Sequence, residues 1–393
     1  MTTAPNVSLL AGDEYLDADE IMNRVRKALP VIKARASEVE ANRRLPPDFV
    51  EMLRSTGVFR MNMPSSWGGP EMTSSQQVRI IEEIATADAS AAWCAMIGTD
   101  SGIYSGFLDE DVAQRLFPRL DMITAGWVFP AGRAERVPGG YRLSGRWRFG
   151  SGCTHADWIV AGCTVYVDGE VQLTSDGKPE WRILVASPND YEIIDTWHTT
   201  GLRGSGSCDY ATEGLFVPEE HSFSFYEPKR SGPINARADA VLRKMSGVPL
   251  GAARAAIDYA RTVAAERIDA GRGPAARFWT TLSRCEMELG AARAYVYESL
   301  DRQWERLSHG EQLTTEERIA VSLSRYHAFR IGRAVVARLC DLVGGASVYT
   351  ERTPLERYLR DLTTACQHAV AQDENLEFAG ELMLGGHPDA PFL

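Results

Sequence analysis

Residues 147–158 read Trp-Arg-Phe-Gly-Ser-Gly-Cys-Thr-His-Ala-Asp-Trp, a strand-like aromatic run that opens onto small residues and then returns to apolar chain. Small, hydrogen-bonding residues at the exit of a strand let a flat ring system approach the backbone closely, and the hydroxyl of Ser151 can bond a ring nitrogen. We interpret this stretch as a platform for such a ring. An ordinary hairpin, in which Ser151, Gly152 and Cys153 only reverse the chain, is the alternative that the stretch leaves open.

The chain around this stretch, from about residue 121 to residue 228, has the period of two that is typical of strands. Gly, Pro, Asn and Asp residues separate its apolar runs, which lie at 141–144, 158–163, 181–186 and 214–217. Residues 137–141, Val-Pro-Gly-Gly-Tyr, predict a hairpin turn. Because no helical pattern lies between these runs, we expect a small antiparallel sandwich or barrel.

Helical periodicity fills the chain on both sides of the predicted strands. Before them, apolar residues three and four positions apart run from about residue 18 to residue 116. After them come four long helical segments, predicted at 241–268, 278–308, 315–343 and 354–383. Short connections favour an antiparallel bundle, and apolar residues on more than one face indicate packing against other subunits. The sequence therefore predicts three domains, an α-helical domain (1–120), a β domain (121–230) and a four-helix bundle (231–393).

The composition excludes several classes of function. At 393 residues with 44% hydrophobic content, the chain can bury a large core, and a net charge of −11 provides no basic surface for nucleic acid or an anionic membrane. No apolar run reaches the ~20 residues that span a bilayer, and residues 1–13 lack the pattern of a signal peptide. We therefore expect a cytoplasmic protein whose seven cysteines are reduced thiols. The seven histidines never occur at the spacing of zinc ligands, so no metal site is expected.

Three motifs accompany this order of helices, strands and helices. They are Pro-Ser-Ser-Trp-Gly-Gly at 64–69, Gly-Leu-Arg-Gly-Ser-Gly-Ser at 201–207, and Gly-Gly-Ala-Ser-Val-Tyr at 344–349 followed by Leu-Glu-Arg-Tyr-Leu-Arg-Asp at 355–361. With these motifs the sequence resembles the acyl-CoA dehydrogenase superfamily over nearly its whole length. The resemblance implies an α+β fold with an N-terminal helical domain, a middle β-sandwich or barrel, and a C-terminal four-helix bundle that assembles a homotetramer.

Further features narrow the resemblance. The most specific is Ser-Gly-Cys-x-His-Ala-x-Trp at 151–158, which is joined by Trp197 and by His368 seven residues after Asp361. In these features the sequence is most similar to the oxygenase components of two-component flavin-dependent monooxygenases, which hydroxylate phenols such as secosteroid phenols and 4-hydroxyphenylacetate. The resemblance implies reduced FMN or FAD from a separate NAD(P)H:flavin reductase, with O2 as co-substrate. It also implies that a flavin C4a-hydroperoxide hydroxylates a small aromatic molecule, in the first place a phenol.

His368 is the predicted catalytic base. Dehydrogenases of the superfamily usually carry a Glu after the Arg-Asp pair, which removes a proton from the carbon next to a thioester. Here residues 362–372 contain no carboxylate, and His368 stands close to that position. An imidazole with its ordinary pKa of about 6.5 can deprotonate a phenol near neutral pH, which raises the electron density at the attacked ring carbon. Alternatively, His368 is a polar residue that satisfies a buried carbonyl.

The resemblance also implies flavin-binding residues. Ser151 would bond flavin N5 or the peroxide adduct. The flavin ring would lie against Trp127, Val128, Gly152 and Cys153. Trp127 can equally be an ordinary core residue.

Four further residues would bind the outer parts of the flavin. Arg203 would face the substrate or the flavin phosphate, although a structural ion pair explains it equally well. Gly344 and Gly345 would approach the nucleotide across a subunit boundary, although two glycines also end a helix. Arg272, with Arg267 and Arg277, is a candidate for a phosphate contact from a neighbouring subunit.

Asp100 departs from the pattern of the related hydroxylases, which often carry a second active-site histidine at this place. An aspartate cannot donate a hydrogen bond at neutral pH unless its pKa is raised. The substrate can therefore differ from a phenol, for instance an amine, an indole or a sulfur compound that is oxygenated at nitrogen or sulfur. A true acyl-CoA dehydrogenase, whose base comes from another helix, and a catalytically silent subunit of a hetero-oligomer are the remaining alternatives.

Overall fold

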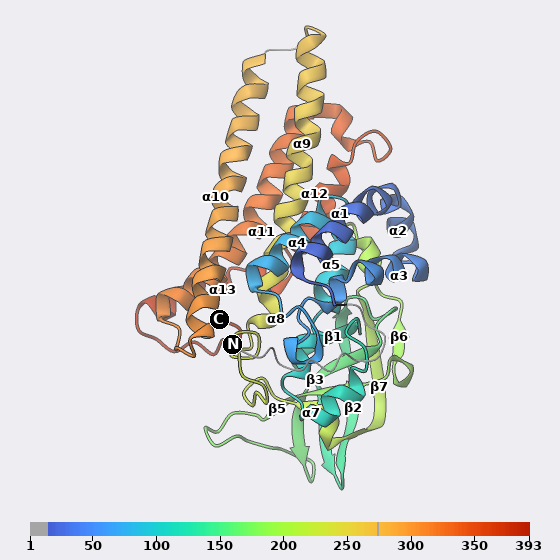
Figure 1. Ribbon diagram of the computed structural model, residues 1–393, viewed down its shortest axis with the longest axis vertical. Helices are drawn as coiled ribbons and strands as arrows, with labels where there is room; N and C mark the ends of the chain where they lie inside the picture. Colours follow the sequence, from blue (N-terminus) through green and yellow to red (C-terminus); the bar gives the residue numbers. More distant parts are fainter. Residues whose placement is uncertain (1–14, 273–274) are drawn as a thin grey trace, which may run out of the picture.

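Helices occupy the chain up to Leu116, strands follow from Thr124 to Phe223, and helices return from Ala240. The computed structural model describes residues 15–272 and 275–393. Figure 1 shows the strands at one end of the molecule and a long helical bundle projecting from the other, with the first helices packed between them. This arrangement confirms the predicted order of helices, strands and helices.

The N-terminal helices begin at residues that cap them. Asp17 accepts a hydrogen bond from the backbone of Glu20 ahead of α1, and Thr73 forms a capping box with Gln76 ahead of α4. The helices are α1 (Ala18–Ala34), α2 (Ala36–Asn42), α3 (Pro47–Thr56), α4 (Ser74–Ala85), α5 (Ala89–Gly98), α6 (Ser101–Ser105) and α7 (Glu110–Leu116). Nearly every residue of α5 is buried, so this helix runs through the middle of the molecule.

The strands form one eight-stranded sheet with the order β6-β7-β2-β1-β3-β5-β8, and β4 pairs with β3. They are β1 (Thr124–Val137), β2 (Gly140–Gly150), β3 (Trp158–Val167), β4 (Glu170–Val171), β5 (Trp181–Ala186), β6 (Glu192–Ile194), β7 (Cys208–Pro218) and β8 (Ser222–Phe223). Val137 pairs with Gly140, which confirms the predicted hairpin turn.

The prediction of a purely antiparallel sheet was wrong for one pair of strands, because β1 and β3 are parallel. The β1–β2 hairpin pairs residues 133–137 with 140–144, and further along β2 the ring of Phe149 lies beside that of Trp127 in the first part of β1. Residues 151–157 then cross to the other side of β1, where Trp158 pairs with Thr124 and β3 starts in the same direction. The turn after β2, which carries Ser151, is therefore also the crossover between two strands.

Trp147, near the end of β2, is a core residue. Its ring stacks on Tyr210 with 5.4 Å between the ring centres, and its indole N–H donates to the carbonyl of Gly162 at 2.9 Å. Gly132 allows this packing, since an added Cβ would lie 2.1 Å from the indole. These contacts hold the end of β2 against its neighbour β7 and against β3, which lies beyond β1 in the sheet.

The C-terminal helices form the bundle. They are α8 (Ala240–Arg243), α9 (Gly247–Asp269), α10 (Ala275–Ser308), α11 (Thr315–Val343), α12 (Leu355–Ala365) and α13 (Glu374–Met383). The single helix predicted at 354–383 was wrong, because the chain breaks between α12 and α13. Side chains stabilise the break: Gln372 Nε2 donates to the carbonyl of Cys366 at 2.7 Å, and Asn375 Nδ2 donates to that of Ala369 at 2.6 Å.

Two further observations concern the chain as a whole. All seven cysteines carry free thiols, and only Cys340 among them is partly exposed. Within the described ranges, no helix combines the length and the apolar composition that a membrane crossing requires.

Candidate functional site

A cavity of about 510 Å³ lies where the sheet and the segment 196–207 face α5 and the end of α12. This volume falls in the range of small-molecule sites. The lining residues are Trp93, Ile97, Gly126, Trp127, Phe149, Ser151, Trp197, His198, Thr199, Thr200, Leu202, Ser207, Thr363, Thr364, Gln367, His368 and Ala369. No Lys, Arg, Asp or Glu of the described chain is among them, so the wall has no permanently charged side chain.

The turn after β2 presents Ser151 to the cavity. Phe149 has a positive φ of 61° and Gly152 one of 78°, so the chain reverses sharply around Ser151. The backbone N–H of Gly152 donates to the carbonyl of Ser205 at 3.0 Å, which ties the turn to the loop before β7. Of the small residues quoted first in the sequence, Ser151 therefore lies at one edge of the cavity.

A bulge turns Trp127 toward the same cavity. The register of β1 and β3 shifts between Trp127 and Gly132, and such a shift re-aims the side chains beside it. The hydroxyl of Tyr210 accepts the backbone N–H of Trp127 at 2.7 Å and donates to the carbonyl of Val160 at 2.8 Å. Gly126 adopts a φ of 133°, where an added Cβ would meet that carbonyl at 2.0 Å.

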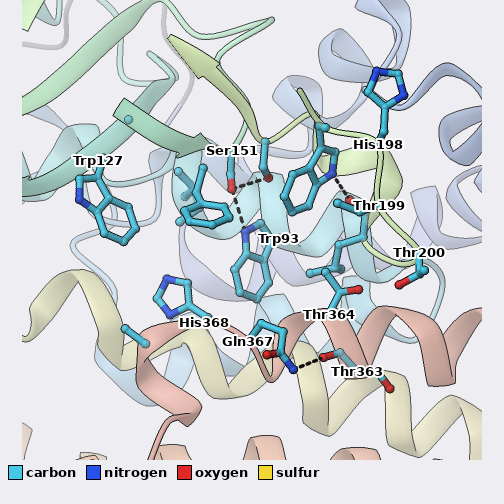
Figure 2. A pocket seen from close by; sticks show the side chains of 17 residues that line it. Trp93, Trp127, Ser151, His198, Thr199, Thr200, Thr363, Thr364, Gln367 and His368 are labelled. Atoms are coloured by element: carbon cyan, nitrogen blue, oxygen red, sulfur yellow. Dashed lines mark hydrogen bonds between the residues drawn. The ribbon is translucent and has the colours of Figure 1, made fainter. Parts of the chain in front are cut away.

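Ser151 belongs to a continuous set of hydrogen bonds. Trp93 donates its indole N–H to Ser151 Oγ at 3.1 Å, and Ser151 Oγ lies 2.7 Å from Ser207 Oγ. Ser207 Oγ lies 2.7 Å from Ser205 Oγ, which donates to the carbonyl of Leu202 at 2.7 Å. Figure 2 shows Trp93 standing between Ser151 on the strand side and His368 on the helix side.

His368 occupies the break after α12. Its backbone is extended, with a ψ of 148°, and its side chain caps the short 3-10 helix Ala369–Ala371 by accepting the backbone N–H of Val370 at Nδ1. The ring meets Trp93 edge to face, with 5.6 Å between the ring centres. Had α12 continued as one helix, its backbone would have bonded internally and His368 would not have formed this cap.

The imidazole of His368 is neutral at physiological pH. Burial lowers its pKa to about 4, with a further contribution from the nearby charge of Arg325. The expectation of an ordinary pKa was therefore wrong, because the ring is removed from water beside a cation. Since Nδ1 accepts the N–H of Val370, the neutral ring carries its proton at Nε2 and presents a hydrogen-bond donor.

The Arg-Asp pair before His368 anchors the wall of the cavity. Asp361 Oδ1 accepts the backbone N–H of Leu202 at 2.6 Å, and the carbonyl of Leu202 accepts the indole N–H of Trp197 at 2.9 Å. Burial raises the pKa of Asp361 to about 7, and the carboxylate of Asp88 adds to the shift. Arg360 pairs with Glu40 and Glu356 rather than with its neighbour. The pair therefore positions the loop that carries Trp197 and Ser207.

The structure brings together only part of the predicted set. Trp127, Ser151 and His368 line the cavity. Gly152 and Cys153 lie directly behind Ser151, where the thiol of Cys153 donates to the carbonyl of Gly206 at 3.7 Å. Val128 lies outside the lining and accepts the indole N–H of Trp181 at its carbonyl.

Asp100 does not line the cavity. Its carboxylate forms a buried ion pair with Lys244, and neither side chain is more than 5% exposed. Burial raises the pKa of Asp100 to about 6, while Lys244 opposes the shift, so the group is ionised at neutral pH. The helix break at Thr99 between α5 and α6 turns Asp100 toward this partner 144 residues away. The structure therefore separates Asp100 from Ser151 and His368.

The four predicted residues for the outer flavin also lie outside the cavity. Arg203 begins the 3-10 helix Arg203–Ser205, and its Nε is buried without a hydrogen-bond partner among the described residues. Gly344 ends α11 with a φ of 74°, and both it and Gly345 are exposed. Arg272 is exposed in the turn after α9, five residues after Arg267, which donates to the carbonyl of Val343 at 2.8 Å. These last three residues share the tip of the bundle, and α12 spans about 15 Å between the tip and the cavity.

Several lining residues were not predicted as site residues. Trp93 lies in a helix that is apolar on all sides, so its sequence context indicates only core. Ser207 ends the quoted Gly201–Ser207 motif, and that motif would have been the signal for it. Close before His368 in the chain lie Thr363, Thr364 and Gln367. Their spacing of five, four and one residues from His368, which places residues on one face of a helix, would have been the signal for them.

Comparisons with known families agree with this architecture. Residues 17–120 match the model of the acyl-CoA dehydrogenase N-terminal domain, and residues 244–373 match that of the acyl-CoA dehydrogenase C-terminal domain. Along the chain, one match precedes the strands and the other follows them. The first contains α5, which carries Trp93, and the second contains α12, which leads to His368.

Relatives narrow the family further. The chain is 30% identical to indole-3-acetate monooxygenase of Pseudomonas putida, over 99% of this chain and 97% of the relative. It is 29% identical to the flavin-dependent monooxygenase oxygenase subunit HsaA of Rhodococcus jostii, over 90% and 95% of the two chains. The structure of XiaF from Streptomyces, in complex with FADH2 and glycerol, superposes with a TM-score of 0.84 at 26% identity, over 96% and 98% of the two chains. The chain therefore belongs to the acyl-CoA dehydrogenase superfamily and, within it, to the flavin-dependent monooxygenases.

Proposed function

We propose that this protein is the oxygenase component of a two-component system, which uses reduced flavin and O2 to hydroxylate a small aromatic molecule. The observation that carries the proposal is the uncharged cavity with Ser151 on its strand wall and the neutral ring of His368 on its helix wall. In the overall reaction one oxygen atom of O2 enters the substrate and the other leaves as water, with two electrons supplied by the flavin.

The residues present fit a flavin ring. Trp127 and Phe149 offer flat apolar surfaces, and Ser151 and Ser207 offer hydroxyl oxygens at hydrogen-bonding distance from one another. An uncharged wall suits a neutral ring system rather than a phosphate. Reduced flavin, when bound, supplies the electrons that turn O2 into an electrophilic oxygen donor.

The flavin phosphate would then lie outside the cavity, where a cation is needed. In this proposal Arg203 binds the phosphate of the flavin held by its own chain, since its buried Nε lacks a partner among the described residues. The exposed tip of the bundle contacts the flavin of a neighbouring subunit through Arg272, Gly344 and Gly345.

The assembly that this requires is a homotetramer. Large apolar side chains stand exposed on and near the bundle, Trp279 and Met287 on α10 and Val348 beside Gly345. Exposed apolar residues of this size commonly mark subunit interfaces. Light scattering of the purified protein should give the mass of four chains, and a monomer would contradict this part of the proposal.

His368 acts in this scheme as a hydrogen-bond donor. Its Nε2–H can bond the oxygen of a phenol, which orients the ring and favours the phenolate form, whose ring carbons are richest in electrons. An indole N–H cannot pair with this donor and would need an acceptor such as Ser207. The aromatic walls of Trp93 and Trp197 exclude water from the reacting atoms. A phenol is therefore the first substrate class to test, and an indole is the second.

The acyl-CoA dehydrogenase alternative lacks a base. None of the described residues that line the cavity is an Asp or Glu, and Asp361 is occupied by the backbone of Leu202. Removal of a proton next to a thioester needs such a group within hydrogen-bonding reach.

The test mixes the protein with photoreduced FMN or FAD, adds 18O2 and a panel of phenols and indoles, and follows products by mass spectrometry. The expected result is one 18O atom in a product that forms only when the protein, the reduced flavin, 18O2 and the substrate are all present. Bleaching of protein-bound flavin by acyl-CoA without oxygen would support a dehydrogenase instead. Failure to bind either flavin, together with co-purification of a homologous chain, would support a silent subunit.

A further inference from the structure

Three serine hydroxyls connect the cavity with a backbone carbonyl in the loop before β7. Ser151 lies at the cavity wall, Ser207 lies next, and Ser205 lies behind it with only 1% of its surface exposed. The three oxygen–oxygen contacts from Ser151 to Ser207, from Ser207 to Ser205 and from Ser205 to the carbonyl of Leu202 all measure 2.7 Å. At this distance each contact must contain a hydrogen, because two oxygen lone pairs would otherwise repel.

The carbonyl at the end determines the direction of the whole chain. It has no hydrogen, so Ser205 must donate to Leu202. Each hydroxyl has one hydrogen only, so the contact between Ser207 and Ser205 must use the hydrogen of Ser207. The contact between Ser151 and Ser207 must then use that of Ser151. This is the single arrangement that places a hydrogen in all three contacts.

Ser151 can therefore only accept a hydrogen bond from the cavity. Its hydrogen points to Ser207, and one of its two lone pairs accepts the indole N–H of Trp93 at 3.1 Å. The second lone pair is left for a ligand. Flavin N5 carries a hydrogen when the flavin is reduced and a lone pair when it is oxidised, so the two redox states need opposite partners.

We infer that Ser205 and Ser207 fix the hydroxyl of Ser151 as an acceptor, and that this direction makes the cavity prefer reduced over oxidised flavin. The inference rests on the proposed function, because it needs the flavin ring beside Ser151. Ser205 is a positioning residue, since it lies outside the lining of the cavity and acts through two other hydroxyls.

The anchor of the chain is held independently of Ser205. The N–H of Leu202 donates to Asp361 at 2.6 Å, and its carbonyl also accepts the indole N–H of Trp197 at 2.9 Å. Loss of the Ser205 hydroxyl therefore leaves the loop attached on both sides. In a Ser205→Ala variant the other two hydroxyls are free to reverse, and Ser151 can then donate to N5 of oxidised flavin.

The experiment measures the dissociation constants of oxidised and of photoreduced FMN, and of FAD in the same way, under anaerobic conditions. Wild type should bind the reduced form more tightly. Ser205→Ala should lower the ratio of the oxidised to the reduced dissociation constant about tenfold. This is the effect of one hydrogen bond that is made to the oxidised flavin instead of to the reduced flavin. The same change lowers the two-electron potential of the bound flavin by about 30 mV, which a redox titration reads independently.

Three further variants complete the test. Ser205→Thr keeps the hydroxyl and should keep the wild-type ratio, whereas Ser207→Ala should lower the ratio and covers the case that Ser205→Ala does not fold. Ser299→Ala is the matched control, because Ser299 is buried, bonds the carbonyl three residues before it and contacts Ser324 Oγ at 2.9 Å in the bundle. Its ratio should not change.

The two possible failures can be told apart. If wild type binds flavin and both Ser205→Ala and Ser207→Ala keep the wild-type ratio of dissociation constants, the inference is overturned while the proposed function stands. If wild type binds neither FMN nor FAD in either redox state, the proposed function is overturned and the inference falls with it.

Discussion

His368 should make the protein less stable as the pH falls below about 6.5. Its folded pKa is about 4, whereas an unfolded histidine has a pKa of about 6.5. Between these two values the unfolded chain binds more protons than the folded chain, so the free energy of unfolding decreases as the pH decreases. Well above pH 6.5 both forms are neutral and the full stability is present.

The size of the effect follows from the same shift. A folded pKa of about 4 corresponds to about 2 kcal/mol of unfolding free energy lost between pH 7 and pH 5. Burial also lowers the pKa of His155 to about 4 and raises the pKa values of Asp88, Asp100 and Asp361, so the contribution of His368 is the difference between wild type and a His368 variant.

Urea unfolding of wild type and His368→Gln at pH 7 and pH 5, followed by circular dichroism, measures the difference. Other titrating groups are common to both proteins and cancel. His309→Gln, which replaces an exposed histidine, is the control and should behave as wild type. If His368→Gln loses as much stability as wild type over this interval, the ring is not held neutral by its surroundings, and the reasoning about its protonation is wrong.

Three more substitutions test other contacts around the site, each by thermal unfolding. Lys244→Met should cost about 3–5 kcal/mol because it leaves Asp100 buried and unpaired, and adding Asp100→Asn should recover most of that loss. Asp361→Ala should cost about 1–3 kcal/mol because the N–H of Leu202 loses its acceptor, whereas Asp361→Asn keeps an acceptor oxygen. Gly201→Ala should cost about 1–3 kcal/mol, since its Cβ would lie 2.1 Å from a carbonyl of α12.

Each of these has an outcome that would contradict it. A double variant no more stable than Lys244→Met would show that the cost does not come from the unpaired carboxylate. Equal losses of stability in Asp361→Ala and Asp361→Asn would show that the cost does not come from the hydrogen bond to Leu202. Gly345→Ala is the control for Gly201→Ala, because nothing lies within 4 Å of its added Cβ, and equal effects at the two glycines would exclude the clash.

Local patterns were sufficient to predict the elements and part of the site. The period of two and the period of three to four reflect which residues of a strand or helix face a core, and this depends on neighbours a few positions away. The turn that carries Ser151 was predicted for the same reason, because small residues directly after an aromatic strand permit it. His368 entered the predicted site through its place after the Arg-Asp pair, and the structure puts it on the lining of the same cavity as Ser151.

The sequence by itself thus determined the order of helices and strands, the superfamily and the two facing walls of the cavity. Only the tertiary structure decided the pairing of Asp100 with Lys244, the low pKa of His368 and the parallel pairing of β1 with β3. It also decided the direction of the hydroxyl of Ser151, which depends on the carbonyl of Leu202. Each of these is set by groups that lie far apart in the chain, and burial and hydrogen bonding act through distance in space rather than distance in sequence.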